Sequence, residues 1–246
     1  MPATKGGDDA MRKGFLFDVF GTLVDWRSGV ADRLGAEFDR RGIDADPTDV
    51  ADHWRSLYAP SMERIRSGAR NYVPLDLLHR ENLDETLAEF GIGETFDADA
   101  RADLGRAWEA LPPWPDVHEG MRRLRPLGYL APCSNGSVAL SVRLARFAGL
   151  HWDAIAGAEL ARDYKPKPEV YLASVRALGL DPHEVVMVAA HNSDLAAARA
   201  LGLGTAFVAR PTEHGPAQTS DLSPEDDWDH VARDLGELAA RIEARG

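Results

Sequence analysis

The sequence predicts an α/β protein whose core is a doubly wound parallel sheet, with a helical domain inserted after the first strand. A short apolar run at 14–18 indicates a buried strand, and the stretch that follows shows only helical periodicity. Beyond residue 112 strand patterns alternate with helix patterns, which is typical of a parallel sheet with helices on both faces. We therefore expect a core of residues 13–25 and 113–246 and an insertion of residues 26–112.

The insertion is expected to contain three helical stretches. Apolar residues at every fourth position predict a helix over 28–42 that Ser28 caps and a glycine ends. A second stretch, 47–68, should be interrupted at Pro60, because a proline inside a helix lacks the N–H that continues the hydrogen bonding. A third stretch ends at Gly91.

The core segments are short and strongly patterned. A fully apolar run at 185–190 predicts a strand of the parallel sheet, because a strand covered on both faces needs no polar alternation. The acidic, proline-containing stretch 221–229 predicts a surface loop before a C-terminal helix. The other expected core elements are strands at 128–133, 152–157 and 205–208 and helices at 138–148, 168–178 and 195–201.

Composition and charge exclude several classes of protein. The chain carries 28 basic and 40 acidic residues, a net charge of −12, which makes nucleic acid and anionic membranes poor partners. The single cysteine, Cys133, excludes an internal disulfide framework and favours a reducing, cytoplasmic location. No apolar stretch approaches the ~20 residues that span a bilayer. Residues 1–13 are polar and predict a disordered start, not a signal peptide.

Polar residues follow four of the expected strands, at the edge where open parallel sheets bind ligands. They are Asp18, Ser134, Lys165 and the segment from His191 to Asp194. Each has an ordinary structural explanation when taken alone, since Asp18 could cap a turn, Ser134 could belong to a turn and Asp194 could cap a helix. Their common placement at one edge of one sheet favours a functional site.

Asp18 enters a glycine-containing turn directly after a buried strand, an arrangement that presents a carboxylate as a nucleophile. Phe20 stands two residues later, where a phosphate-processing enzyme of this type carries a second Asp. A phenyl ring has no proton to donate, so the pattern points away from phosphoryl chemistry.

Together these motifs resemble the haloacid dehalogenase superfamily and, within it, the type II L-2-haloacid dehalogenases. The first family motif is similar to residues 17–23, the second to 134–136, and the third to 164–166, which Tyr171 follows. Arg55 lies where the family places a halide-contacting arginine in its helical cap. The resemblance covers nearly the whole chain and implies a Rossmann-like core with an inserted cap.

The fourth motif departs from the superfamily pattern. Ala190 stands where the phosphatases of the superfamily place an Asp that helps to hold Mg²⁺. Because Mg²⁺ requires carboxylate oxygens, Ala190 and Phe20 together predict an enzyme with no metal and no other cofactor. His191 stands where dehalogenases commonly have Asn. We expect it to hydrogen-bond next to the catalytic residues or to take part in water activation.

The resemblance implies a first step in which Asp18, kept ionised by Lys165, attacks the halogen-bearing carbon of a short L-2-haloacid and forms an ester. The halide would leave towards Arg55 and Asn135, which place donors where negative charge develops. Ser134, Lys165 and backbone N–H groups of the turn after the first strand would hold the substrate carboxylate.

The second implied step is attack of water on the ester carbonyl, helped by Asp194 and by His191 or Thr22. Phe20 would line the substrate site at the turn, and Tyr171 would hydrogen-bond Asp194 or Lys165. The expected partners are the 2-haloacid and the halide, with no nucleic acid and no membrane, and the sequence is compatible with a homodimer. Two alternatives stay open: a Mg²⁺-dependent phosphatase, and a non-catalytic protein that binds a small acid.

Overall fold

The computed structural model describes residues 12–244, so the prediction for residues 1–13 lies almost wholly outside the described residues. Six parallel strands form one sheet in the order β3-β2-β1-β4-β5-β6. β1, the first strand in the chain, joins this sheet, as expected, and lies between β2 and β4. The strands are β1 (Gly14–Phe17), β2 (Tyr129–Ser134), β3 (Ala156–Gly157), β4 (Val185–Ala189), β5 (Gly204–Val208) and β6 (His230–Ala232).

Two edge strands differ from the prediction. β3 is only two residues long, and the rest of the expected strand 152–157 is irregular. β6 was missed, because its three residues give too short a pattern to stand out after the acidic loop. It pairs with β5, and Asp229 holds it there by accepting a bond from the Thr205 N–H at 2.8 Å.

The segment between β1 and β2 is helical, as expected. α2 and α3 are separated at Leu57, not at the predicted Pro60. Pro60 lies in the first turn of α3, where its missing N–H would have no helical partner anyway. Asp25, not Ser28, caps α1 by accepting the Ser28 N–H at 3.0 Å. The elements are α1 (Trp26–Arg41), α2 (Pro47–Ser56), α3 (Tyr58–Arg66), α4 (Leu75–Glu89), η1 (Gly93–Thr95), α5 (Ala98–Leu104) and η2 (Gly105–Glu109).

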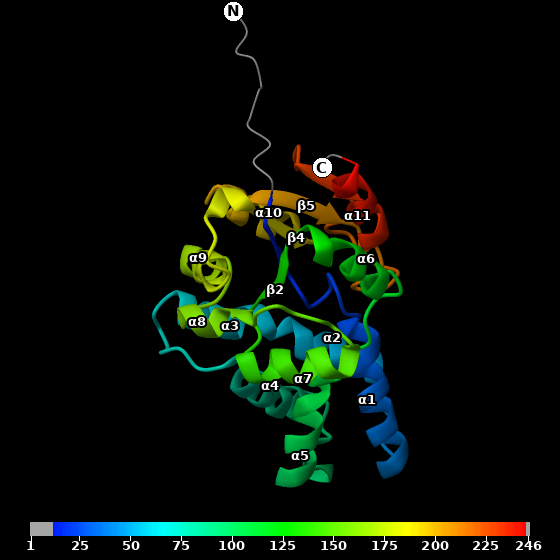
Figure 1. The fold of residues 1–246 in the computed structure, drawn as a ribbon. Coiled ribbons are helices and arrows are strands. Elements are labelled where there is room, and N and C mark those ends of the chain that lie inside the picture. Colours follow the sequence, from blue (N-terminus) through cyan, green and yellow to red (C-terminus); the bar gives the residue numbers. More distant parts are fainter. Residues whose placement is uncertain (1–11, 245–246) are drawn as a thin grey trace, which may run out of the picture.

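The core helices cover both faces of the sheet. α9 and α10 pack together against β2 to β5, whereas α6 packs on α11, which lies on β5 and β6 (Figure 1). α10 begins three residues earlier than the predicted 195–201, so Asp194 lies in its first turn. The elements are α6 (Val117–Leu124), η3 (Arg125–Leu127), α7 (Val138–Ala148), α8 (Ala158–Ala161), α9 (Pro168–Ala177), η4 (Pro182–Glu184), α10 (Asn192–Arg199) and α11 (Leu235–Glu243).

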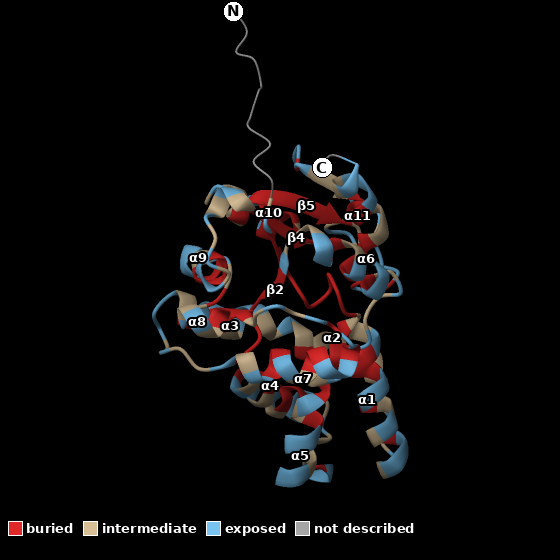
Figure 2. Cartoon of the chain, in the orientation of Figure 1, coloured by how far each residue is buried: buried red, intermediate tan, exposed pale blue. Residues whose placement is uncertain are grey.

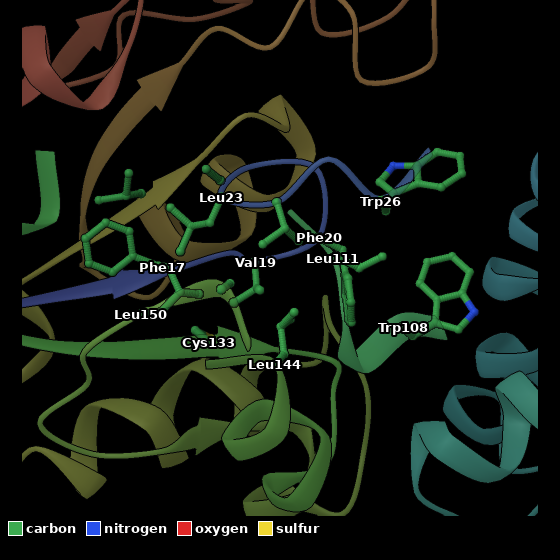
Figure 3. Close-up of a cluster of buried hydrophobic side chains, with 14 of the residues drawn as sticks. Phe17, Val19, Phe20, Leu23, Trp26, Trp108, Leu111, Cys133, Leu144 and Leu150 are labelled. Atoms are coloured by element: carbon green, nitrogen blue, oxygen red, sulfur yellow. The ribbon is translucent and has the colours of Figure 1, made fainter. Parts of the chain in front are cut away.

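The helical insertion lies along the carboxyl ends of the strands and shares one apolar core with the sheet (Figure 1). Buried residues occur both in the strands and in the inserted helices (Figure 2). At the junction Phe20 and Leu111 lie between the strand residues and the stacked rings of Trp26 and Trp108 (Figure 3), whose centroids are 6.0 Å apart. These contacts hold the insertion against the carboxyl ends of the strands. The limits 26–112 stay a prediction.

Within residues 12–244, no helix is both long enough and apolar enough to cross a membrane.

Candidate active site

Asp18 directly follows β1, and its position is fixed by backbone and side-chain bonds. Its N–H donates to the carbonyl of Val188 on β4 at 3.0 Å, which continues the sheet by one residue. Thr22 donates its hydroxyl to Asp18 Oδ2 at 2.7 Å, across a turn that Gly21 makes possible with a φ of +87°. The carboxylate is therefore buried and held at the carboxyl edge of the sheet.

Lys165 connects two carboxylates that follow different strands, Asp18 after β1 and Asp194 after β4. Its Nζ donates to Asp18 Oδ1 at 2.8 Å and to Asp194 Oδ2 at 2.6 Å. Tyr171, on α9, donates its hydroxyl to the other Asp194 oxygen at 2.5 Å. Burial opposes the charge on Lys165, but the two carboxylates outweigh it and raise its pKa well above the usual value. Lys165 is therefore an ammonium ion at neutral pH.

His191 lies between Asp18 and a second carboxylate, Glu213. Its Nδ1 lies 3.2 Å from Asp18 Oδ2, and its Nε2 lies 2.8 Å from Glu213 Oε2. Burial lowers its pKa, but Glu213 and Asp18 together raise it well above the value of free histidine. While both carboxylates are charged, the ring is therefore an imidazolium.

Sequence reasoning missed Glu213. Its side chain is 1% exposed, and Trp26 donates its indole N–H to the other oxygen at 3.0 Å. Burial raises the pKa of Glu213, but the charge of His191 lowers it by more, so the group is a carboxylate. A signal was available, because residues 209–213 follow β5 at the same edge of the sheet as the other four groups.

The pKa of Asp18 results from opposing effects. Burial raises it, whereas the charges of Lys165 and His191 lower it by more, and the net result lies well below the usual value for Asp. Asp18 is therefore fully ionised at neutral pH, as a nucleophile must be.

Arg55, on α2, brings a cation to the site from the insertion. Its guanidinium carbon lies 4.0 Å from the Tyr58 ring centre and 5.1 Å from that of Trp26. Its Nη1 is buried and has no hydrogen-bond partner in the described part of the chain. A buried donor without an acceptor carries an energetic cost, which an anion placed beside it would remove.

These groups surround one cavity of about 170 Å³. That volume suits a ligand of a few heavy atoms, because drug-sized ligands need roughly 300 Å³ or more. The residues that line it are Asp18, Phe20, Arg55, Tyr58, Asn135, Lys165, Pro166, Tyr171, His191, Ser193 and Asp194.

Two predicted site residues, Thr22 and Ser134, do not line this cavity. The Thr22 hydroxyl donates to Asp18 and accepts the Ala190 N–H at 2.9 Å, so both directions are used and it orients the carboxylate. The Ser134 hydroxyl is buried and accepts the Gly136 N–H at 3.2 Å. The predicted roles of Thr22 in ester hydrolysis and of Ser134 in holding the substrate carboxylate stay predictions.

Asn135 has a defined orientation. Its Oδ1 accepts the Lys165 backbone N–H at 2.8 Å. Because the carbonyl end of the amide is used there, its NH₂ end is left to donate elsewhere. Asn135 lines the cavity together with Arg55, so the site offers donors to an anion from both the core and the insertion.

The donor set does not fit Mg²⁺. The two oxygens of Asp18 already face Lys165, His191 and a hydroxyl, of which the first two are cations. Phe20 packs edge-on against the Trp108 ring at 5.8 Å, and Ala190 is a buried methyl group. Within residues 12–244, no three His, Cys, Asp or Glu side chains are arranged to hold a metal ion.

Comparisons with known proteins agree with this geometry. The family model described as haloacid dehalogenase-like hydrolase matches residues 12–202. An (S)-2-haloacid dehalogenase of Xanthobacter autotrophicus is 30% identical over 85% of this chain and 79% of its own length. The crystal structure of a defluorinating L-2-haloacid dehalogenase is 47% identical, with a TM-score of 0.92 over 94% of this chain and 95% of that one.

A second solved structure contains a covalently bound acid. It is an L-2-haloacid dehalogenase from Xanthobacter autotrophicus with chloropropionic acid covalently bound. It is 26% identical, with a TM-score of 0.79 over 96% of this chain and 100% of that one.

Proposed function

The chain belongs to the haloacid dehalogenase-like hydrolase family, and we propose that it hydrolyses short 2-haloacids to 2-hydroxy acids through an ester on Asp18. The observation that carries this proposal is the pairing of Asp18 with Lys165 and His191 in a cavity of about 170 Å³. Two cations keep the nucleophile charged, and the volume of the cavity suits a small substrate. The cytoplasm is the proposed location, from the single, buried thiol of Cys133.

In the first step an Asp18 oxygen forms a bond to the substrate carbon C2 while the carbon–halogen bond breaks. The halogen leaves with the bonding electrons as halide, towards the guanidinium of Arg55 and the NH₂ of Asn135, two residues that line the cavity. The aromatic rings around Arg55 exclude water, which strengthens the attraction between guanidinium and halide. Donors placed in this way stabilise the charge as it develops.

Ester formation changes the charge balance around His191. Asp18 loses its negative charge, so one of the two carboxylates that raise the pKa of His191 is gone. The ring can then release its Nδ1 proton to solvent, while Nε2–H still donates to Glu213. Nδ1, which lies on the Asp18 side, becomes free to accept a proton.

In the second step His191 takes a proton from water as the water oxygen attacks the ester carbonyl of Asp18. The Cγ–O bond to the substrate then breaks, and the leaving oxygen takes the second proton of the water. The 2-hydroxy acid leaves, and the Asp18 carboxylate and the imidazolium are restored. The overall reaction consumes one water and releases one halide and one proton, as hydrolysis of a carbon–halogen bond requires. Asp194 and Tyr171 keep Lys165 beside Asp18 during both steps.

Halide release tests the proposal directly. Purified protein is incubated with chloroacetate, bromoacetate, fluoroacetate and L-2-chloropropionate, and halide is measured beside an Asp18→Asn variant. We expect release by the wild type only. If no substrate yields more halide with the wild type than with the variant, the proposed function is wrong. A phosphatase would instead release phosphate in a Mg²⁺-dependent manner, and a binding protein would retain substrate without an adduct on Asp18.

A further inference from the structure

The main chain of Lys165 is held from two sides, one in the core and one in the insertion. Its N–H donates to Asn135 Oδ1 at 2.8 Å, and Asn135 follows β2. Its carbonyl accepts a bond from Arg66 Nη1 at 2.8 Å, and Arg66 is the last residue of α3. The Arg66 side chain is 15% exposed, and its Nε donates to Glu63 at 2.8 Å. The guanidinium is thus fixed on its own helix before it reaches the core.

The preceding residue is attached to the insertion as well. Tyr164 is fully buried and donates its hydroxyl to the carbonyl of Val73 at 2.7 Å. Its ring lies 5.5 Å from that of Tyr72, in the same inserted segment. The loop that carries the lysine therefore contacts the insertion at two neighbouring residues.

The position of the Lys165 backbone matters because its side chain is long. Four rotatable bonds separate Cα from an ammonium that lies within 2.8 Å of Asp18 and 2.6 Å of Asp194. A displacement of about 1 Å of a catalytic group can lower a rate about 10²-fold. A loop that moved with the insertion would therefore carry the ammonium away from the nucleophile.

We infer that Arg66 is a positioning residue, which makes the placement of Lys165 beside Asp18 depend on the insertion being seated against the core. The inference rests on the proposed function and adds to it a residue outside the cavity. Arg66 touches neither the nucleophile nor the space for the substrate. It acts through the Lys165 carbonyl alone.

The test compares Arg66→Ala with Arg64→Ala, since Arg64 lies on the same helix and is exposed. For Arg66→Ala we expect kcat for halide release to fall about 10- to 100-fold, with KM changed much less. Arg64→Ala should match the wild type. Should Arg66→Ala fail to fold, Arg66→Lys, which keeps a donor on a flexible stem, is compared in the same way with Arg64→Lys.

The pH profile separates positioning from general stability. Lys165 and His191 face Asp18 as cations, Asp194 and Glu213 face those cations as carboxylates, and Arg55 approaches from α2. Withdrawal of Lys165 would raise the pKa of Asp18 and move the acid limb of kcat/KM to higher pH. Loss of stability alone would lower the active fraction and leave the limb in place.

The outcomes are distinguishable. An acid limb displaced in the Arg66 variant but not in the Arg64 variant supports the inference. If the two variants have the same kcat and the same acid limb of kcat/KM, the inference is wrong. A crystal structure of Arg66→Ala provides a readout without turnover, in which an unchanged Lys165–Asp18 distance also overturns it. If the wild type releases no halide, the proposed function is at fault, and the structural readout still decides the role of Arg66.

Discussion

Replacement of Glu213 by Gln should stop the reaction after its first step. Gln keeps the shape of Glu213 but removes the charge that lies 2.8 Å from His191 Nε2. At an effective dielectric constant of ~20 that contact corresponds to about 6 kcal/mol as an upper limit, because both charges are spread over several atoms. Half of that value is still a pKa change of about 2 units for His191.

The orientation of the new amide adds a second effect. Trp26 donates its indole N–H to one oxygen of Glu213 at 3.0 Å. In the variant this donor needs an acceptor, so the amide oxygen of Gln faces Trp26 and its NH₂ group faces His191. The histidine must then accept at Nε2 and carry its proton on Nδ1. This tautomer leaves no acceptor on the Asp18 side, and hydrolysis of the ester should slow by about 10² to 10⁴, the usual contribution of a general base.

Rapid mixing with L-2-chloropropionate provides the assay. The Glu213→Gln variant should release a burst of one halide per active site and then turn over slowly. Intact-protein mass spectrometry should find the ester, and peptide mapping should locate it on Asp18. His214→Gln is the matched control, because His214 approaches the other Glu213 oxygen at 3.5 Å from a partly exposed position. If the Glu213→Gln variant turns over at the wild-type rate with no detectable ester, or if it shows no burst of halide, the proposed role of His191 is wrong.

Three further predictions concern stability, pH and metal ions. Gly21→Ala should lower the free energy of unfolding by about 3 kcal/mol in chemical denaturation, because a Cβ there would lie 2.0 Å from Glu213 Oε1 at a φ of +87°. The pKa of His191 is higher in the folded state than in the unfolded state, so its protonation stabilises the fold. This stabilisation is complete below the unfolded pKa of about 6.5 and is lost as pH rises through the folded pKa. Between pH 7 and 10 the wild type should therefore lose Tm more steeply than His191→Asn, and parallel curves would contradict this. Asp18 has the opposite pH dependence, because its pKa is lowered in the folded state. The stability that its carboxylate contributes is lost only as pH falls through the folded pKa. Halide release should be the same with and without a chelator. If the chelator abolishes activity and added Mg²⁺ restores it, the prediction from Phe20 and Ala190 of an enzyme without a metal is wrong.

Local pattern was sufficient for most of the fold. The apolar run at 185–190 predicted β4 because a strand covered on both faces leaves no choice of residue type. β6 was missed, since three residues carry too little pattern and their pairing with β5 depends on a contact with Asp229. The break between α2 and α3 was placed at Pro60 because the sequence does not reveal whether a proline lies inside a helix or in its first turn.

The sequence by itself predicted which polar groups lie together at one edge of the sheet. Asp18, Lys165, His191 and Asp194 follow strands, and parallel strands bring their carboxyl ends to one edge whatever the loops between them do. Only the tertiary structure decided how these charges pair. Glu213 reaches His191 across 22 positions and Arg66 reaches Lys165 across 99, through loop paths that no local periodicity encodes. Chemistry is a property of residue types, whereas pKa values and positioning depend on distances that exist only once the chain has folded.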